Sequence, residues 1–377
     1  MHSIGIIAEY NPFHNGHVYQ INKIKEKYPN DIIILIMTGN FTERGEVTII
    51  DKWSRTEIAL NHGIDLVIEL PYPFATQSAD YFAYGGITLL EALKVDRLIF
   101  GSESNDIDTI KTIASIQIEN KDFDNLVKFY SKQGKNYPTA LSCAVKELTG
   151  KEIETPNDLL GISYLKTILK NNYNITAETI KRTNNYHNKE LNETISSGTA
   201  IREALKMNES IINQIPNDTI SYYKTIHTMD DYFDLLKYKI LTEEELSKYQ
   251  TVEEGIEKVL KKEINKATNY DDYIKRIKSK RYTYNKISRM LLHILCNFTK
   301  EKANQWKEPE YIRTLGFNQK GREYLNTIKK DIKLPIISKI KREKNNMLEF
   351  EIKTTNIYNI KKTSNQKEED KIIIKGE

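Results

Sequence analysis

Short apolar runs, rich in β-branched residues, alternate with amphipathic stretches through the first two hundred positions of the chain. Five of them have the length of single strands: IGIIAEY (4–10), DIIILIMTG (31–39), IDLVIELP (64–71), VDRLIFGSE (95–103) and NITAETIKR (174–182). Such runs are typical of parallel strands whose two faces are both buried under helices. The alternation predicts an α/β fold, a Rossmann-like doubly wound parallel sheet.

The stretches between the runs have the periodicity of helices. We expect helices at 17–28, 51–63, 79–94, 107–118, 138–149, 156–171 and 195–206. From about residue 208 the strand signal gives way to helical patterns, which continue to about residue 300. The sequence therefore predicts an α/β domain over 1–207, a mainly α-helical C-terminal domain over 208–360 and a flexible tail over 361–377. Possible strands within the second domain are 334–341 and 348–360.

Length, hydropathy and cysteine content exclude several classes of protein. The 377 residues suffice for more than one domain, and no apolar run approaches the roughly 20 residues that span a bilayer. The chain enters a strand-like run at once, without an export signal, so we expect a cytoplasmic protein. Cys143 and Cys296 lack the spacing of metal ligands, and we expect reduced thiols.

The charge is unevenly distributed along the chain. The net charge of +4 combines +12 from residue 271 onward with −8 before it. A basic C-terminal third favours binding to a polyanion such as nucleic acid. The alternative is an ordinary lysine-rich surface.

His14, Asn15, Gly16 and His17 form an H-x-G-H sequence between the first predicted strand and the first helix. The chain has neither G-x-x-x-x-G-K-[ST] nor G-x-G-x-x-G in the corresponding place. A helix that starts at the carboxyl edge of a parallel sheet offers N–H groups to a phosphate, and His14 and His17 would add two donors. We predict that both act on a phosphate in the transition state. The alternative is a pair of half-buried histidines that cap a loop.

A second segment, ISSGTAIREAL (195–205), opens a predicted helix late in the domain. Ser196 and Ser197 offer hydroxyl and N–H donors, and Arg202 could reach the outer phosphates of a nucleotide. Taken alone, the segment could also be a helix N-cap with a surface arginine.

H-x-G-H after the first strand, with a Ser-Ser…Arg segment later, is the signature of the nucleotidylyltransferase superfamily. Longer segments, among them GIIAEYNPFHNGH, MTGNFTERGEVTIIDKWSRTEIALNHGIDLVIELP and PNDLLGISYLK, closely resemble the bacterial tRNA(Met) cytidine acetate ligase family. The resemblance extends to about residue 325. It implies a nucleotidylyltransferase-type sheet and an enzyme that makes acetyl-AMP from acetate and ATP, with Mg²⁺ accompanying ATP. The acetyl group would then pass to N4 of the wobble cytidine of elongator tRNA(Met).

The same resemblance implies which residues contact ATP. They are Ile7, Ala8, Glu9, Tyr10, Asn11, Pro12, Phe13, His14, Asn15, Gly16, His17, Gln20, Gly101, Asn157 and Arg182. The second motif adds Ser196, Ser197 and Arg202, and we expect His14, His17 and Arg202 to be catalytic. The residues themselves leave alternatives open: a turn glycine at 101, an N-cap at 157 and a surface ion pair at 182. The chain departs from the family pattern with Glu43 in place of Gln and Asn188 in place of Asp.

Two further segments are candidates for contact with substrate RNA. In the loop GNFTERGEVTIIDKWSR, Asn40, Arg44 and Lys52 could close over acetyl-AMP or the target base. In IKRIKSKRYTYNKISR (274–289), phosphate contacts and base stacking are expected from Lys275, Arg276, Lys280, Arg281 and Tyr282. Solvated charges are the alternative for both segments. His187 is a weak candidate for a base in acetyl transfer.

Two rival functions remain open at this point. One is another H-x-G-H enzyme, such as the acetate ligase of the citrate lyase carrier. The other is a non-catalytic RNA-binding protein that retains the fold. The intact His14, Gly16 and His17 argue against the second, and the basic C-terminal third argues against the first.

Overall fold

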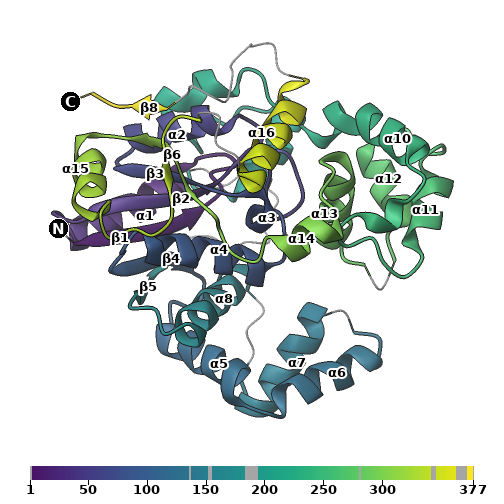
Figure 1. Cartoon of the computed structure of the whole chain (residues 1–377), viewed down its shortest axis with the longest axis horizontal. Helices are drawn as coiled ribbons and strands as arrows, with labels where there is room; N and C mark the ends of the chain where they lie inside the picture. Colours follow the sequence, from purple (N-terminus) through teal and green to yellow (C-terminus); the bar gives the residue numbers. More distant parts are fainter. Residues whose placement is uncertain are drawn as a thin grey trace.

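The computed structural model describes residues 2–135, 137–151, 155–182, 194–279, 282–340, 345–361 and 372–376. An eight-stranded sheet in the order β5-β4-β1-β2-β3-β6-β7, with β8 on β6, runs through the first and last parts of this chain (Figure 1). The five parallel strands are β1 (Ser3–Ala8), β2 (Ile32–Thr38), β3 (Leu66–Leu70), β4 (Arg97–Ser102) and β5 (Thr176–Lys181). The predicted doubly wound sheet is therefore confirmed.

The winding direction reverses between β1 and β4. From β1 the chain adds β2 and then β3 on one side, and it crosses back to place β4 and β5 on the other side. The loops that leave the carboxyl ends of β1 and β4 consequently diverge, which opens a crevice at this point of the sheet.

Helices cover both faces of the sheet. Alternate residues of β2 belong to two different apolar clusters: Ile34 and Ile36 face one side, whereas Ile33 and Leu35 face the other. The first side packs against α4 (Ala79–Ala92), α5 (Ile107–Glu119) and α8 (Pro156–Lys170), and the second against α1 (Asn15–Lys27), α2 (Lys52–Asn61) and α9 (Gly198–Lys206). Burial on both faces explains why the strands are apolar throughout.

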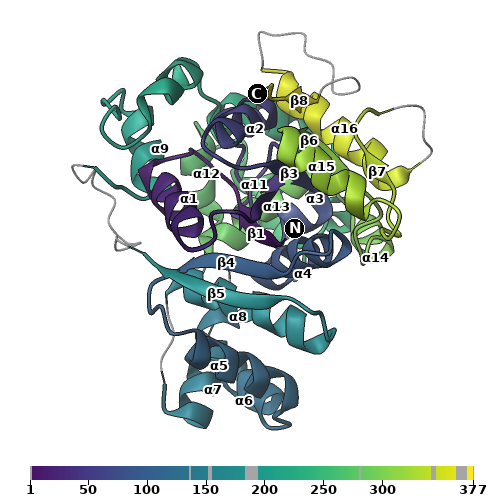
Figure 2. The ribbon, with the colours of Figure 1, turned by 90° about the vertical axis from the view of Figure 1, so that its left-hand side faces the viewer.

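A helical hairpin, α6 (Phe123–Lys132) and α7 (Tyr137–Thr149), projects from the sheet next to α5 (Figure 2). Helix α6 was not expected from the sequence; its residues 123 and 127 are buried, while most others are exposed. The short helix α3 (Tyr72–Ala75) follows β3. No helix among the described residues is long and apolar enough to cross a bilayer.

Residues 217–305 form the helical part. Its elements are η1 (Asn217–Tyr223), η2 (Met229–Tyr232), α10 (Phe233–Thr242), η3 (Leu246–Lys248), α11 (Ile256–Glu263), α12 (Tyr270–Ile277), α13 (Tyr284–Leu295) and α14 (Lys300–Gln305). Helices α10 to α13 lie together beside the sheet (Figure 1), and their apolar residues join the core on the α4 side.

The chain then returns to the sheet, which corrects the predicted extent of the helical domain over 208–360. Strand β6 (Ile312–Phe317) pairs antiparallel with β3 and is buried over its first five residues. Strands β7 (Ile336–Ile337) and β8 (Ile373–Ile374) pair with β6, and α15 (Gln319–Ile328) connects β6 to β7. Because β6 covers the edge of β3, it protects a strand that would otherwise expose unpaired backbone groups. The predicted tail also ends in a strand, whereas 362–371 lie outside the described residues.

The prediction of a strand at 348–360 is wrong. The predicted strand at 334–341 is confirmed only for Ile336 and Ile337, which form β7. Residues 346–359 form α16 (Asn346–Asn359), whose buried side chains include Met347, Phe350, Thr354 and Tyr358. This spacing has the period of a helix rather than of a strand. The β-branched residues of the segment suggested a strand, but packing across α16 outweighs that preference.

Candidate active site

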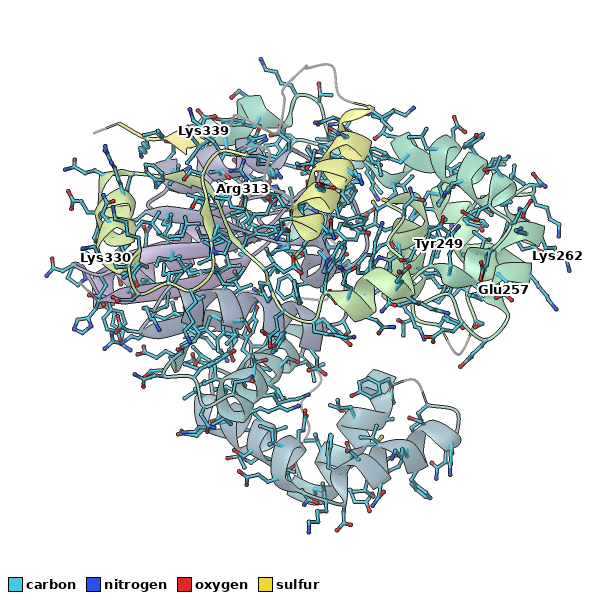
Figure 3. All side chains as sticks on the ribbon, in the orientation of Figure 1. Tyr249, Glu257, Lys262, Arg313, Lys330 and Lys339 are labelled. Atoms are coloured by element: carbon cyan, nitrogen blue, oxygen red, sulfur yellow. The ribbon has the colours of Figure 1, made fainter. Side chains whose placement is uncertain are left out.

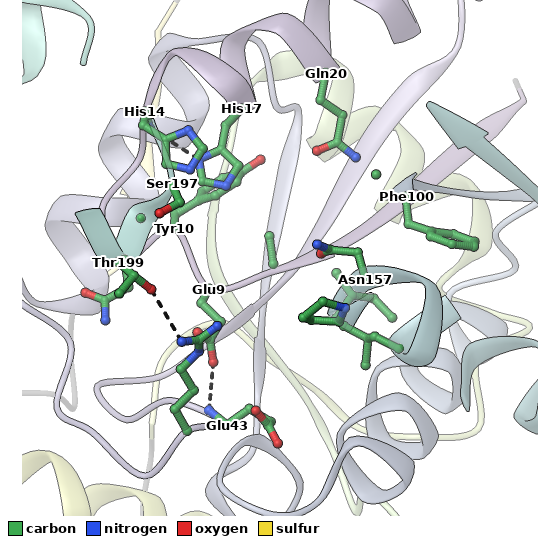
Figure 4. Close-up of a pocket in the computed structure, with 18 of the residues that line it drawn as sticks. Glu9, Tyr10, His14, His17, Gln20, Glu43, Phe100, Asn157, Ser197 and Thr199 are labelled. Carbon is green, nitrogen blue, oxygen red and sulfur yellow. Dashed lines mark hydrogen bonds between the residues drawn. The ribbon is translucent and has the colours of Figure 1, made fainter. Parts of the chain in front are cut away.

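A cavity of about 290 Å³ opens where the sheet reverses its winding direction. Its walls come from the segment after β1, the first turn of α1, the end of β4 and the starts of α8 and α9 (Figure 4). Ligands of open α/β sheets bind in this position. The structure thus brings the H-x-G-H segment and the Ser-Ser…Arg segment, about 180 residues apart in sequence, into one site.

His14 and His17 form a stacked pair at the start of α1. Nδ1 of His14 accepts the Gly16 N–H at 3.1 Å, and the His14 N–H donates to Nδ1 of His17 at 3.2 Å. The ring centroids are 3.8 Å apart, and a Cβ at position 16 would lie 2.9 Å from the His14 ring, so the stack requires glycine. Because each Nδ1 accepts a hydrogen bond, the neutral rings carry their hydrogens on Nε2. The cavity therefore has two adjacent N–H donors at a helix N-terminus.

Burial keeps both rings neutral. Burial, together with the charges of Arg182 and Arg202, lowers the pKa of His14 to about 3. Burial and the neighbouring His14 ring also lower the pKa of His17 well below its usual value. The histidines thus donate hydrogen bonds without adding charge, and the positive charge of the cavity comes from its arginines.

We predict that His14 does not titrate in the neutral range. A solvated histidine takes up a proton near pH 6.5, whereas a lowered pKa leaves His14 neutral as the pH falls from 8 to 5. The measurement is the imidazole Cε1–H resonance of ¹³C-histidine-labelled protein between pH 8 and 5, assigned by its loss in His14→Asn. An inflection near pH 6.5 at this resonance would show that the ring is solvated.

The second motif caps α9 and directs Arg202 towards the same cavity. Oγ of Ser197 accepts the Ala200 N–H at 3.1 Å, so the N-cap reading of this segment is correct. Arg202 is not a free surface side chain: its Nη1 donates to the Asn11 carbonyl at 2.8 Å, and Nη2 lies 3.6 Å from the Glu46 carboxylate. These contacts hold the guanidinium at the cavity wall.

Glu103, which the sequence analysis did not select, positions two of the expected ATP contacts. Arg182 lies 3.6 Å from its carboxylate, and the Asn157 amide donates to the same oxygen. Asn157 is not the N-cap of α8, because that position belongs to Thr155. A signal was available in the sequence, since Glu103 follows directly on the strand that ends near Gly101.

Most of the expected ATP contacts line the cavity. They are Ile7, Ala8, Glu9, Tyr10, Asn11, Pro12, His14, His17, Gln20, Gly101, Asn157, Arg182, Ser197 and Arg202. Gly16 and Ser196 line a smaller space behind the histidines. Phe13 and Asn15 line neither: Phe13 packs between Tyr10 and His17, and the Asn15 amide donates to the carbonyls of residues 194 and 213. These two side chains hold the loop in place.

Apolar residues that the sequence analysis missed form another part of the cavity wall. They are Ala79, Phe82, Phe100, Pro156, Leu160 and Tyr164. Their types are those of ordinary core residues, so nothing in the sequence distinguishes them, although Phe100 precedes Gly101 and Leu160 follows Asn157 by one helical turn. The hydroxyl of Tyr10 is buried without a hydrogen-bond partner among the described residues. Such a group suits a cavity that a polar ligand fills.

The loop after β2 differs from the prediction for RNA contact. Arg44 lines the cavity and donates to Oγ1 of Thr199 at 3.4 Å. Asn40 and Lys52 are buried instead. Oδ1 of Asn40 accepts the Lys52 N–H, and Nζ of Lys52 lies 2.6 Å from the Glu69 carboxylate, with the side chains of Lys52 and Glu69 both 0% exposed. Neither side chain faces a substrate, because the loop folds inward onto the sheet.

The same loop joins the cavity to the helical part. The Glu43 N–H donates to the Glu9 carboxylate at 2.7 Å, and the Glu43 carboxylate pairs with Arg289 of α13 at 2.8 Å. Gly45 has a φ of +84°, and a Cβ there would lie 2.2 Å from the Arg289 nitrogen. The loop therefore requires glycine at this crossing.

The basic segment of the helical part is exposed in part. Lys275 and Arg276 are exposed on α12, with Arg276 paired to Asp272 at 3.0 Å. Lys280 and Arg281 lie outside the described residues. Tyr282 is buried, its hydroxyl donates to the Glu253 carbonyl, and Nζ of Lys286 lies over its ring at 4.8 Å. Stacking of a base on Tyr282 is therefore excluded in this arrangement, since the ring has no open face.

No three His, Cys, Asp or Glu side chains of the described residues gather closely enough to hold a metal ion. The cavity does present the carboxylates of Glu9 and Glu43. Mg²⁺ keeps several waters and binds through one or two carboxylates together with substrate phosphates. The residues thus fit an ion that enters with ATP.

Comparison with known proteins establishes the family. The model of the HIGH nucleotidyl transferase family matches residues 1–371. A tRNA(Met) cytidine acetate ligase of Geobacillus sp. is 42% identical over 358 residues, which cover 90% of this chain and 89% of that protein. The chain belongs to the tRNA(Met) cytidine acetate ligase family. Another relative of this name, from Mycoplasma mobile, is 42% identical over 302 residues, covering 79% of this chain and all of its own length.

Solved structures of this family share the fold. Two crystal structures of Thermotoga maritima TmcAL, 31% identical in sequence, each cover the whole of both chains. The ligand-free form superposes with a TM-score of 0.92, and the form bound with alpha-thio ATP with a TM-score of 0.90. A nucleotide therefore binds to a protein of this fold and family.

Proposed function

We propose that this protein is an ATP-dependent ligase that acetylates N4 of the wobble cytidine in elongator tRNA(Met). The observation that carries the proposal is the pair of Nε2–H donors of His14 and His17, which lines one cavity together with Arg182 and Arg202. This arrangement suits a phosphate chain whose charge grows during reaction. Family membership points to the same activity.

The first step is the formation of acetyl-AMP. An acetate oxygen attacks the α-phosphorus of ATP in line, the bond to the β-phosphate oxygen breaks, and pyrophosphate leaves. Acetate is already an anion, so this step needs no general base. His14, His17 and the two arginines position and stabilise the phosphates. Mg²⁺ would enter with ATP, near Glu9 and Glu43, and neutralise phosphate charge.

The second step transfers the acetyl group. The cytidine N4 amine attacks the acetyl carbonyl carbon, AMP leaves as the phosphate anion, and the amine loses a proton. His187, the candidate for this proton, lies outside the described residues. We assign the ATP chemistry to residues 1–207 and tRNA binding to the helical part, where Lys275 and Lys278 are exposed cations on one side.

One assay tests the proposal against its rivals. The protein is incubated with ATP, ¹⁴C-acetate and total bacterial tRNA, and label is followed in acetyl-AMP and in tRNA. We expect label in both, and N4-acetylcytidine after digestion of the tRNA. Acetyl-AMP without labelled tRNA would favour a ligase with another acceptor, such as a carrier protein. Binding of tRNA without either product would contradict an enzymatic function.

A further inference from the structure

A second cavity, of about 560 Å³, adjoins the first. It lies between the sheet domain and the helical part, with walls from the loop at 44–49, α9, η2, α12 and α13. Arg44, Thr199 and Arg202 line both cavities. These three side chains therefore form a wall that the two cavities share.

The small space behind the histidines, which also borders the first cavity, is too small to admit a base. The space behind the histidines measures about 50 Å³, which corresponds to a few water molecules at most. The second cavity, at about 560 Å³, is large enough to hold a base.

The charge of the second cavity favours an amine over a phosphate. Its four carboxylates outnumber its three cations: Glu46, Glu203, Asp230 and Asp271 against Arg44, Arg202 and Lys206. Two cations are already paired, Arg202 with Glu46 at 3.6 Å and Lys206 with Glu203 at 3.2 Å. An RNA phosphate would be repelled here, whereas an uncharged base with an exocyclic amine can donate to a carboxylate.

An aromatic ring is available to stack on such a base. Tyr284, at the start of α13, lines the cavity and is 37% exposed. Glu46, Asp271 and Glu203 line the same cavity, and burial together with these three charges raises the pKa of the Tyr284 hydroxyl. Tyr270, the other tyrosine of the cavity, is buried and its hydroxyl is bonded to Ser288. Tyr284 is therefore the ring that can meet a ligand.

We propose that the second cavity holds the acceptor nucleobase, an unpaired pyrimidine with an exocyclic amine. The base stacks on Tyr284, and its amine donates to Glu46, which the Arg202 pair holds at the junction of the two cavities. The RNA backbone stays outside, on the exposed cations of α12. This placement rests on the proposed function, and it assigns the site at which the acceptor base binds.

The test separates the two half-reactions in the full-length protein. In Tyr284→Ala, we expect kcat/KM for acetyl transfer to tRNA to fall about tenfold or more, as for the loss of one base-stacking contact. Acetate-dependent ATP–pyrophosphate exchange should stay within threefold of the parent. Tyr284→Phe should retain transfer, because it keeps the ring. Tyr238→Ala, at a tyrosine that is 68% exposed on α10 and outside the cavity, is the matched control.

A second measurement does not depend on a variant. An anticodon stem-loop with 5-iodocytidine at the wobble position is irradiated with the parent protein, and the adduct is mapped by mass spectrometry. An adduct at Tyr284 supports the proposal, and adducts only at residues outside the cavity overturn it. Acetyl transfer to tRNA by Tyr284→Ala at the rate of the parent would also overturn the proposal. In that case labelled tRNA made by the parent protein would still support the proposed function.

Discussion

His14→Asn is expected to lower the rate of acetyl-AMP formation by about 10²- to 10³-fold, the usual loss for one transition-state hydrogen-bond donor. Asparagine is a good N-cap residue, and its Oδ1 can accept the Gly16 N–H as Nδ1 does now. The variant thus keeps the start of α1 and removes the Nε2–H donor. The measurement is acetate-dependent ATP–pyrophosphate exchange.

Two controls make the result specific to chemistry. The melting temperature of His14→Asn should match that of the parent, and its affinity for tRNA should be unchanged, because the helical part is untouched. The double variant His14→Asn/His17→Asn should lose little more than the single one, since the stacked rings act on the same phosphate as a unit. If His14→Asn catalysed ATP–pyrophosphate exchange at the rate of the parent, His14 would not be a catalytic residue.

Lys52→Ala is expected to lower the free energy of unfolding by about 3–5 kcal/mol. The pair of Lys52 and Glu69 is 0% exposed, and removal of the ammonium leaves a buried carboxylate without this partner. The Glu351 carboxylate is also buried beside Gly39, so the loss of the ammonium leaves two buried carboxylates close together. Arg313 of β6 is opposite Glu69 of β3 and lies among the strands (Figure 3). Lys330 and Lys339, by contrast, project at the surface in the same view. The measurement is urea unfolding followed by circular dichroism.

An exposed ion pair provides the matched control. Lys23 and Glu26 are 2.6 Å apart, but their side chains are 44% and 62% exposed, so Lys23→Ala should change stability far less than Lys52→Ala. The apolar double variant Lys52→Met/Glu69→Leu should recover most of the stability that Lys52→Ala loses. If the Lys52→Ala protein were as stable as the parent but no longer bound tRNA, the result would instead support the RNA contact of Lys52 that the sequence predicts.

The sequence alone determined the parallel sheet and the core of the candidate site. Runs such as DIIILIMTG are apolar on both faces, and this property is local, so periodicity sufficed to predict β2. The position of His14 and His17 was equally predictable, because a motif between a strand and a helix must lie at the carboxyl edge of a parallel sheet. Arg202 followed from its motif, although its bond to the Asn11 carbonyl did not.

The tertiary structure decided which way side chains face and which distant segments meet. Asn40 in the loop after β2 and Lys52 at the start of α2 carry polar side chains, yet both are buried, with Lys52 paired to Glu69. The return of β6 to the edge of β3 joins segments about 250 residues apart, and no local pattern encodes that pairing. The second cavity likewise exists only because α9 faces α12 and α13. Residue type and spacing set local structure, whereas burial depends on contacts between segments whose distance in sequence carries no information about their distance in space.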